Sequence, residues 1–330
     1  MPAGDNPTDA PGAEQPPPHP IPVYPIGPPI PLPEQGTWPK SIHRFDADTA
    51  AALRAAEAAE RPLLIRGDPG TGKSQTARAA AAAAGRLFVS VTIDGRTEAA
   101  DLLWQHDAVA RLADAQSGQG AGPPGDYLSP GPLWWAYDWT SAERQWQAQQ
   151  QGERPDAPAG WRQEAGTVLL IDEIDKADPD LPNAFLELLG NRGFTVPLLG
   201  RQVIRGARPP LVIITTNEER ELPNAFLRRC LVRTLRLPEP LAPWLAGMGR
   251  LHLERLGLAA CCFDDVLAAA ARLLLDDRRA AEQSQRYQPG LAEYLDLVIA
   301  VARLEPTEPK QQELLGQLAG FALRKSDDAD

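Results

Sequence analysis

The 330-residue chain has few cysteines, and their arrangement excludes a disulfide framework. There are three, two of them adjacent (Cys261 and Cys262), and no C-x-x-C pair occurs. Disulfide-rich secreted domains and structural zinc sites both need several cysteines at regular spacing. We therefore expect reduced thiols that behave as small apolar side chains in a cytoplasmic protein.

Two further absences concern membranes and targeting. No stretch of 18 apolar residues occurs, so no membrane-spanning helix is predicted. Residues 1–39 contain no Lys or Arg and no apolar run, which argues against a secretory signal or transit peptide. Both observations favour a soluble protein without membrane contact.

Positive charge is also scarce. The chain has 33 Lys and Arg against 44 Asp and Glu, a formal net charge of −11. Broad, sequence-independent nucleic-acid binding needs clustered positive charge, so nucleic acid is not the expected partner. A local basic channel remains compatible with this total.

Proline is concentrated at the start, where it makes up 13 of the first 33 residues. Such a segment buries little apolar surface, so we expect residues 1–40 to form a largely disordered tail. The run 27–33 (GPPIPLP) is typical of a stiff spacer or of a polyproline ligand. Tyr24, Ile26 and Ile30 are the residues of this tail expected to pack on the body.

Five short apolar runs lie within residues 41–237 and alternate with helical patterns, of which 47–59 and 73–84 are rich in alanine. The predicted strands span 63–65, 87–93, 167–171, 211–216 and 231–237. Strands that alternate with helices indicate an α/β domain built on a parallel sheet. Residues 238–330 have no strand pattern and predict a small helical domain, with helices near 241–256, 263–280, 289–303 and 309–324.

The interval between the second and third predicted strands is too long for a simple crossover and predicts an insertion at about 96–166. It contains six of the eight tryptophans, namely Trp104, Trp134, Trp135, Trp139, Trp146 and Trp161. They either pack the insertion on the body or form an aromatic contact surface for a partner.

A phosphate-binding pattern follows the first predicted strand. Residues 67–74 read GDPGTGKS, which matches G-x-x-x-x-G-K-[ST] between an apolar strand and a helix. In this motif backbone N–H groups surround the phosphates, the lysine reaches the β and γ oxygens and the hydroxyl binds Mg²⁺. The predicted nucleotide-binding residues are Gly67, Asp68, Pro69, Gly70, Thr71, Gly72, Lys73, Ser74 and Gln75.

Two polar strand ends complete the predicted site. The strand VLLID ends at Asp172, predicted to bind Mg²⁺ beside Ser74, and Glu173 is placed to polarise the attacking water. The strand LVIITT is followed by Asn217, whose amide either orients that water or caps the next turn. Carboxyl ends of parallel strands share one edge, so these groups are expected to meet.

The segment 222–230 (LPNAFLRRC) ends in two arginines before the last predicted strand. Arg228 and Arg229 either complement a helix C-terminus or form an arginine finger that acts on a neighbouring subunit's nucleotide.

In this order and spacing the four motifs resemble those of the AAA+ ATPases. GDPGTGKS is similar to Walker A, LLIDEID to Walker B, IITTN to sensor 1 and LPNAFLRRC to the arginine-finger helix. Within that class, RPLLIRGDPGTGKSQTA, GPLWWA, LLIDEIDKADPDLPNAFLELL and TTNEERELPNAFLRRC are similar to MoxR-like ATPases. The resemblance covers about residues 41–300.

The resemblance implies a P-loop core with sheet order 5-1-4-3-2, an insertion near the second helix and a helical lid. It implies a β-hairpin at 194–197 and 202–205 with its turn at 199–201, and favours Arg229 over Arg228 as the finger. No sensor 2 arginine is assigned, because Leu291 and Ala292 occupy the corresponding place and only Arg286 lies near.

By resemblance the expected function is hydrolysis of ATP with Mg²⁺ at the subunit interfaces of a homo-oligomeric, hexameric ring. Such a ring would remodel or activate a protein client, with a von Willebrand factor A domain protein as the possible partner. Two alternatives stay open: the motor of a nucleic-acid translocase or restriction/defence system, and a nucleotide-gated scaffold with negligible hydrolysis.

Overall fold

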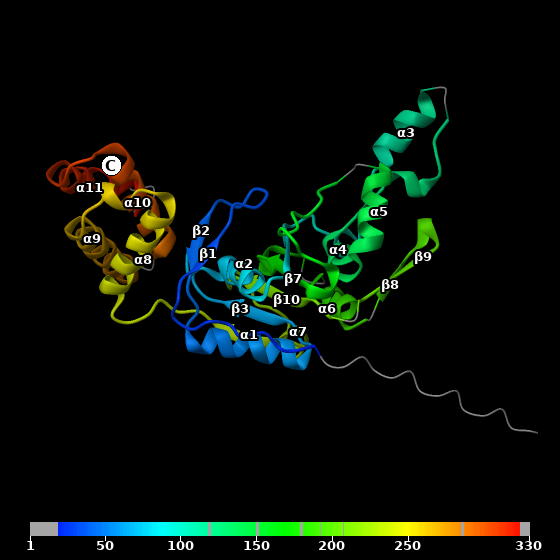
Figure 1. Ribbon diagram of the computed structural model, residues 1–330, viewed down its shortest axis with the longest axis horizontal. Coiled ribbons are helices and arrows are strands. Elements are labelled where there is room, and N and C mark those ends of the chain that lie inside the picture. Colours follow the sequence, from blue (N-terminus) through cyan, green and yellow to red (C-terminus); the bar gives the residue numbers. More distant parts are fainter. Residues whose placement is uncertain are drawn as a thin grey trace, which may run out of the picture.

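The computed structural model describes residues 19–117, 120–149, 152–178, 181–191, 193–206, 208–284 and 287–323. A mixed α/β body lies between a helical region at one end and a projecting insertion at the other (Figure 1). The predicted tail residues 1–18 and Arg286 lie outside the described residues.

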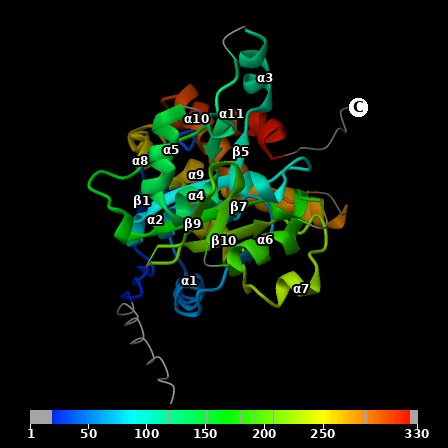
Figure 2. The same ribbon diagram turned by 90° about the vertical axis from the view of Figure 1, so that its right-hand side faces the viewer.

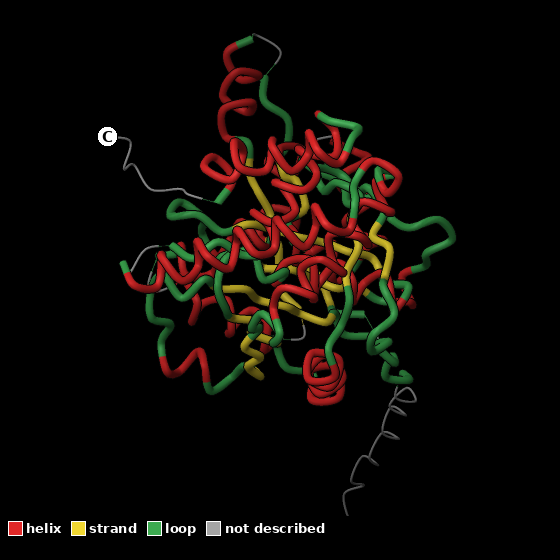
Figure 3. The backbone as a smooth tube through the Cα atoms, turned by 90° about the vertical axis from the view of Figure 1, so that its left-hand side faces the viewer, coloured by secondary structure: helices red, strands yellow, loops and turns green. Residues whose placement is uncertain are grey.

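A five-stranded parallel sheet forms the centre of the body (Figure 3). Its strands are β3 (Leu63–Arg66), β4 (Leu87–Thr92), β7 (Thr167–Asp172), β10 (Leu211–Thr216) and β11 (Leu231–Thr234). They lie in the order β11-β3-β10-β7-β4, and every neighbouring pair is parallel. Counted along the chain this is 5-1-4-3-2, so the predicted fold class and strand order are confirmed.

Successive side chains of each strand point to opposite faces and build two cores. One face packs Leu63 and Ile65 against α1 (Ala47–Ala59) and α2 (Lys73–Ala84). The run of alanines in α2 lets that helix approach the sheet closely. α1 begins where Asp46 accepts a hydrogen bond from the Thr49 amide at 2.6 Å, a typical N-cap.

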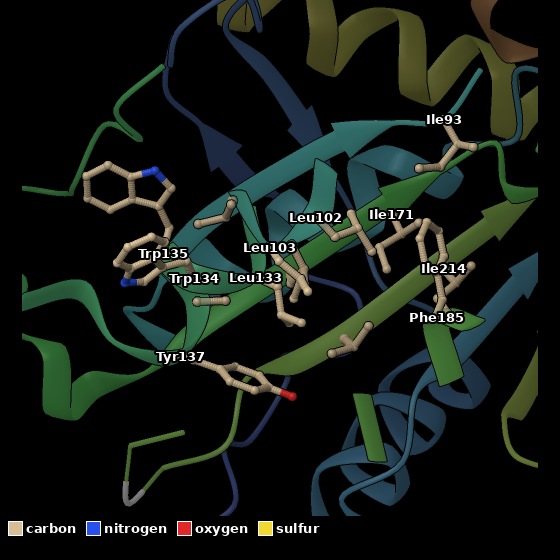
Figure 4. Close-up of a cluster of buried hydrophobic side chains, with 14 of the residues drawn as sticks. Ile93, Leu102, Leu103, Leu133, Trp134, Trp135, Tyr137, Ile171, Phe185 and Ile214 are labelled. Carbon is tan, nitrogen blue, oxygen red and sulfur yellow. The ribbon is translucent and has the colours of Figure 1, made fainter. Parts of the chain in front are cut away.

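The opposite face carries the larger core (Figure 4). Strand residues such as Ile171 and Ile214 meet the buried side chains of α4 (Pro132–Tyr137), α6 (Leu181–Gly190) and α7 (Asn224–Leu227). Because both faces are covered, the strands read as continuous apolar runs, which is why the sequence predicts them well.

The predicted insertion contains β5 (Trp104–His106), α3 (Ala108–Gln116), β6 (Leu128–Pro130), α4 and α5 (Trp139–Gln149), with short 3₁₀ turns at Ala99–Leu102, Pro124–Tyr127 and Gln163–Ala165. Two of its tryptophans are core residues. Trp134 is fully buried and donates from Nε1 to the Ser141 hydroxyl at 2.7 Å, and Trp135 packs beside it. For these two the packing interpretation is correct. α3, by contrast, stands away from the body (Figures 1 and 2) and has no buried residue.

The expected hairpin is present with its boundaries shifted by one residue. β8 (Gly193–Val196) pairs antiparallel with β9 (Arg201–Ile204), and Val196 lies opposite Arg201. The turn therefore spans 197–200 and includes a 3₁₀ turn at Pro197–Leu199, so Arg201 belongs to a strand and Pro197 does not. Proline at 197 has no N–H to donate and closes the strand early.

Four helices form the region after the sheet: α8 (Leu241–Leu256), α9 (Asp264–Gln283), α10 (Leu291–Leu304) and α11 (Glu308–Ala322), with a 3₁₀ turn at Ala259–Cys261. They share one apolar core that includes Leu245, Leu267 and Tyr294. Among the described residues, no helix is long and apolar enough to cross a membrane. All three cysteines are unpaired.

The prediction of disorder is wrong for residues 19–40. β1 (Ile30–Leu32) pairs antiparallel with β2 (Ser41–His43), so the centre of the proline-rich run is a paired strand rather than part of a spacer or a free ligand. Tyr24 and Leu32 are buried in the core below the sheet, whereas Ile26 is exposed. The buried guanidinium of Arg78 donates to the carbonyl oxygen of Pro33 at 2.7 Å. A few apolar side chains and one arginine thus outweigh the disordering composition.

Truncation of Leu32 tests this structural role. Leu32→Ala removes a buried side chain, and we expect it to lower the free energy of unfolding by about 2–5 kcal/mol in urea titrations. Ile26→Ala is the matched control, because Ile26 is 59% exposed and its loss should change stability by less than about 0.5 kcal/mol. Equal, small effects would mean that residues 19–40 do not pack on the core.

Candidate nucleotide-binding site

The predicted site residues meet at the carboxyl edge of the sheet because the strands are parallel and in register. Thr216 at the end of β10 pairs with Arg66 at the end of β3, and Ile214 pairs with Ile171 of β7. The phosphate loop after β3, the acidic pair at the end of β7 and Asn217 after β10 therefore lie side by side.

The phosphate loop has the backbone that its glycines allow. Gly67 has φ 142°, and a Cβ there would collide with the carbonyl oxygen of Leu235. Gly72 is the N-cap residue of α2 and has a left-handed backbone conformation. It has no side chain that could accept a hydrogen bond, so no cap side chain pairs with the first N–H groups of the helix. Such a helix start binds anions.

Lys73 is buried and folded back on the loop. Its Nζ donates to the carbonyl oxygens of Gly67 at 2.7 Å and Asp68 at 2.9 Å. Burial lowers the pKa of Lys73, while Asp172 and Asp68 oppose that shift. The ammonium group is thus held against the backbone of the loop. Gln75 is engaged elsewhere, since its side-chain oxygen accepts from Arg78 at 3.0 Å and from the Ser41 hydroxyl at 3.2 Å.

Ser74 and Asp172 are brought together as predicted for a magnesium site. The Ser74 hydroxyl donates to Oδ1 of Asp172 at 2.9 Å, across 98 residues of sequence. Mg²⁺ prefers a few hard oxygen ligands, keeps several waters and takes the rest from phosphates. The pair fits that ion, although the described residues hold no cluster of three or more His, Cys, Asp or Glu that could bind a metal alone.

Glu173 lies next to this pair with a constrained backbone. Its φ of 60° is left-handed, which is uncommon for a residue with a Cβ and occurs at sites where the surrounding structure imposes it. Oε2 accepts from Lys176 Nζ at 2.8 Å and Oε1 from Asn217 Nδ2 at 3.4 Å. Glu173 and Asn217 are therefore in contact, which supports a shared role for them at one water.

Sequence patterns missed Thr215, which links the acidic pair. Its hydroxyl donates to Asp172 and accepts from the Glu173 amide at 3.0 Å. It belongs to the run that precedes Asn217, so a hydroxyl in an otherwise apolar strand was the available signal. Lys176, three residues after Glu173, was also missed.

The predicted arginine finger lies at the opposite edge of the sheet. Arg228 and Arg229 follow α7 and precede β11, whose first residue pairs with Leu63 at the start of β3. Both are exposed, and no described residue accepts a hydrogen bond from either guanidinium.

Arg61 braces this segment and was not predicted. Its guanidinium donates to the backbone carbonyl oxygens of Arg228, of Arg229 at 3.0 Å and of Cys230 at 3.5 Å. These contacts join positions almost 170 residues apart, and no local pattern could have indicated them.

The helical region touches the phosphate loop where a sensor 2 residue would lie. A Cβ placed on Gly70 would lie 3.4 Å from the Ala292 Cβ and 3.4 Å from Oε2 of Glu293. Glu293 is buried and accepts from the Gly290 amide at 2.8 Å and the Tyr287 hydroxyl at 2.9 Å. At this contact the described part of α10 presents Ala292 and Glu293, not an arginine.

A parallel α/β sheet with a phosphate loop and an acidic strand end at one edge defines a P-loop nucleotide-binding domain. The model of the AAA domain, dynein-related subfamily, matches residues 62–230, which is over half of the chain. The chain therefore belongs to this AAA family.

Two other comparisons add little. A solved structure described as a "putative ATPase" from Cytophaga hutchinsonii ATCC 33406 aligns over 84% of this chain and 80% of its own, with 12% sequence identity and a TM-score of 0.37. That alignment is too weak to strengthen the fold assignment. Comparison with curated proteins finds no match.

Thr215 and Thr216 offer a matched test of the site. Both are buried and both accept one backbone N–H, from Glu173 and Glu218, but only Thr215 touches Asp172. Thr215→Val and Thr216→Val should each cost about 1–3 kcal/mol of stability by leaving an amide unpaired. Only Thr215→Val should also lower the rate of ATP hydrolysis, by at least about tenfold, because it frees the Asp172–Glu173 pair. Equal losses of rate in folded protein would remove Thr215 from the site.

Proposed function

We propose that the chain is an ATPase that hydrolyses ATP at the interfaces between subunits of a homo-oligomeric ring, with six subunits as the expected number. The observation that carries this proposal is the arrangement at the carboxyl edge of the sheet, where Lys73, Ser74, Asp172, Glu173 and Asn217 converge. The family match supports nucleotide binding by this domain.

Each group at this edge has a defined task. The loop amides at 67–72 and the N-terminus of α2 bind the phosphates, and Lys73 exchanges its contacts with Gly67 and Asp68 for β and γ oxygens. Mg²⁺ held by Ser74 and Asp172 would neutralise charge that develops on the phosphates. Glu173 accepts a proton from the attacking water while the Asn217 amide orients it.

The position of the arginines supports catalysis between subunits. Arg229 lies just before the pairing level of Leu63, whereas the phosphate loop begins at Gly67. Four strand residues separate the two levels, about 13 Å at 3.3 Å per residue. An arginine at the far edge is too distant to act on the nucleotide of its own subunit. It is free to enter the nucleotide site of a neighbouring subunit, where it would stabilise the charge of the transition state.

Hydrolysis in such a ring drives movement. Ala292 and Glu293 place the helical region directly against Gly70 of the phosphate loop. Nucleotide bound at the loop would therefore alter the angle between the helical region and the α/β body. We infer a MoxR-like role in remodelling or activating a protein client, for which a von Willebrand factor A domain protein is the partner class that the sequence resemblance implies.

Complementation between two inactive variants tests this proposal. Glu173→Gln and Arg229→Ala should each lower hydrolysis by about 10²- to 10⁴-fold while ATP binding, measured with a fluorescent analogue, persists. Mixed in equal amounts, the two should recover about a quarter of wild-type activity, because one interface in four joins an intact Glu173 to a neighbour's intact Arg229.

Other results would favour the alternatives. No recovery in the mixture, with both variants assembled, would contradict catalysis between subunits. Wild-type protein that binds ATP but does not hydrolyse it would support a scaffold. Hydrolysis that is stimulated by DNA and falls steeply with salt would support a nucleic-acid motor, against the net charge of −11.

Arg61 is predicted to position the finger without touching nucleotide. Arg61→Met keeps the aliphatic stem and removes the three carbonyl contacts, so we expect at least a fivefold loss of hydrolysis with unchanged ATP affinity. Mixed with Glu173→Gln, the Met variant should recover activity as Arg229→Ala does, because its own Glu173 is intact and the partner variant supplies a braced Arg229. Arg54→Met, an exposed change on α1, is the control and should behave as wild type. A normal rate for Arg61→Met would show that the brace has no part in catalysis.

A further inference from the structure

A cavity of about 680 Å³ lies at the amino-terminal edge of the sheet, opposite the phosphate loop. Its walls come from the end of α1, the residues before β3 and β4, the start of β10 and the segment after β9. That volume is typical of a small-molecule site. No described residue of the predicted phosphate loop or acidic pair lines it.

Positive charge dominates the lining. Four arginines (Arg61, Arg86, Arg205 and Arg208) face two glutamates, Glu57 and Glu60. Both glutamates are already paired, Glu57 with Arg86 at 2.7 Å and Glu60 with Arg205 at 3.0 Å. Among the described residues, Arg61 and Arg208 have no carboxylate partner and donate only to backbone carbonyls. The cavity therefore carries an excess of two positive charges.

The arginines also have buried donors without acceptors. Arg86 is only 2% exposed, and its Nε and Nη1 contact no acceptor among the described residues. The same holds for Nε of Arg208. A buried donor without an acceptor is unfavourable, so a ligand oxygen that reached these groups would be held by hydrogen bonds. Burial is the main cause that lowers the pKa of Arg208; the neighbouring Arg86 adds to it, and Glu57 opposes it.

The remaining walls are apolar. Ile21, Leu189 and Val212 line the cavity together with several prolines and alanines. A ligand that matches this surface carries an anionic head and an apolar body. An inorganic anion would satisfy the donors but leave the apolar walls uncovered, and a neutral apolar molecule would leave the donors unpaired.

We propose that this cavity binds a small organic anion, whose oxygens accept hydrogen bonds from Arg86 and Arg208 and whose apolar body packs on the apolar part of the lining. A carboxylate and a phosphate monoester share this chemistry, since both offer two or more charged oxygens to a guanidinium. The cavity is separate from the phosphate loop and the acidic pair, and it shares only Arg61 with the segment that carries the proposed finger.

Calorimetric titration of the nucleotide-free full-length chain tests the proposal with three probes: hexanoate, hexyl phosphate and the neutral hexanamide. We expect at least one anion to bind and hexanamide to bind at least tenfold more weakly. The stronger of the two anions identifies carboxylate or phosphate as the natural head group. Lys73→Met removes the phosphate-loop cation and should leave the affinity of that anion unchanged, so failure of one site is distinguishable from failure of the other.

Arg208→Met keeps the stem and removes the charge, and should weaken anion binding at least tenfold. The double variant Arg86→Met, Glu57→Gln removes both members of the buried ion pair. It provides the same test of anion binding if Arg208→Met does not fold. Arg54→Met should bind as wild type. Equal binding of hexanamide, no binding of either anion, or anion affinity that survives both arginine variants would overturn the proposal.

Discussion

The parallel register of β3, β10 and β7 is the constraint on which the rest of the structure depends. Because the strands run the same way, the loop after β3 and the acidic end of β7 reach one edge of the sheet although they lie far apart in the sequence. Thr215 then connects Asp172 to the backbone of Glu173, and Ser74 completes the link to the phosphate loop. A one-residue slip of β10 would turn the Thr215 hydroxyl to the other face of the sheet and break this link.

The two edges of the same sheet carry different features. The carboxyl edge carries the proposed ATP site, and the amino-terminal edge carries the Arg229 segment and the cationic cavity. Arg61 belongs to both features of the second edge, since it lines the cavity and holds the carbonyl oxygens of residues 228–230. A single rigid sheet can thus fix the distance between a subunit's own site and the group it offers to a neighbour.

Much of the fold could be predicted from sequence because its signals are local. Strands buried on both faces appear as apolar runs, and the GDPGTGKS motif fixes the place of Lys73 and Ser74 at the start of a helix. Composition misled at residues 19–40, where an average dominated by proline predicted disorder. Tyr24 and Ile30 were expected to pack on the body and are buried, and Leu32 joins them in the core. The contacts of Arg61 and the cavity at the amino-terminal edge could not be predicted. Both bring together residues that are far apart in the sequence and whose side chains have no periodic pattern.

In the proposed ring, each catalytic site is complete only between two subunits. The most direct measurement is the steady-state rate of ATP hydrolysis per subunit as protein concentration rises through the micromolar range, with the mass of the same samples determined by light scattering. If the finger of a neighbour completes each site, the rate per subunit rises in step with the fraction of protein in the ring and levels off when assembly is complete. The same rate per subunit in monomer and in assembled protein would contradict it.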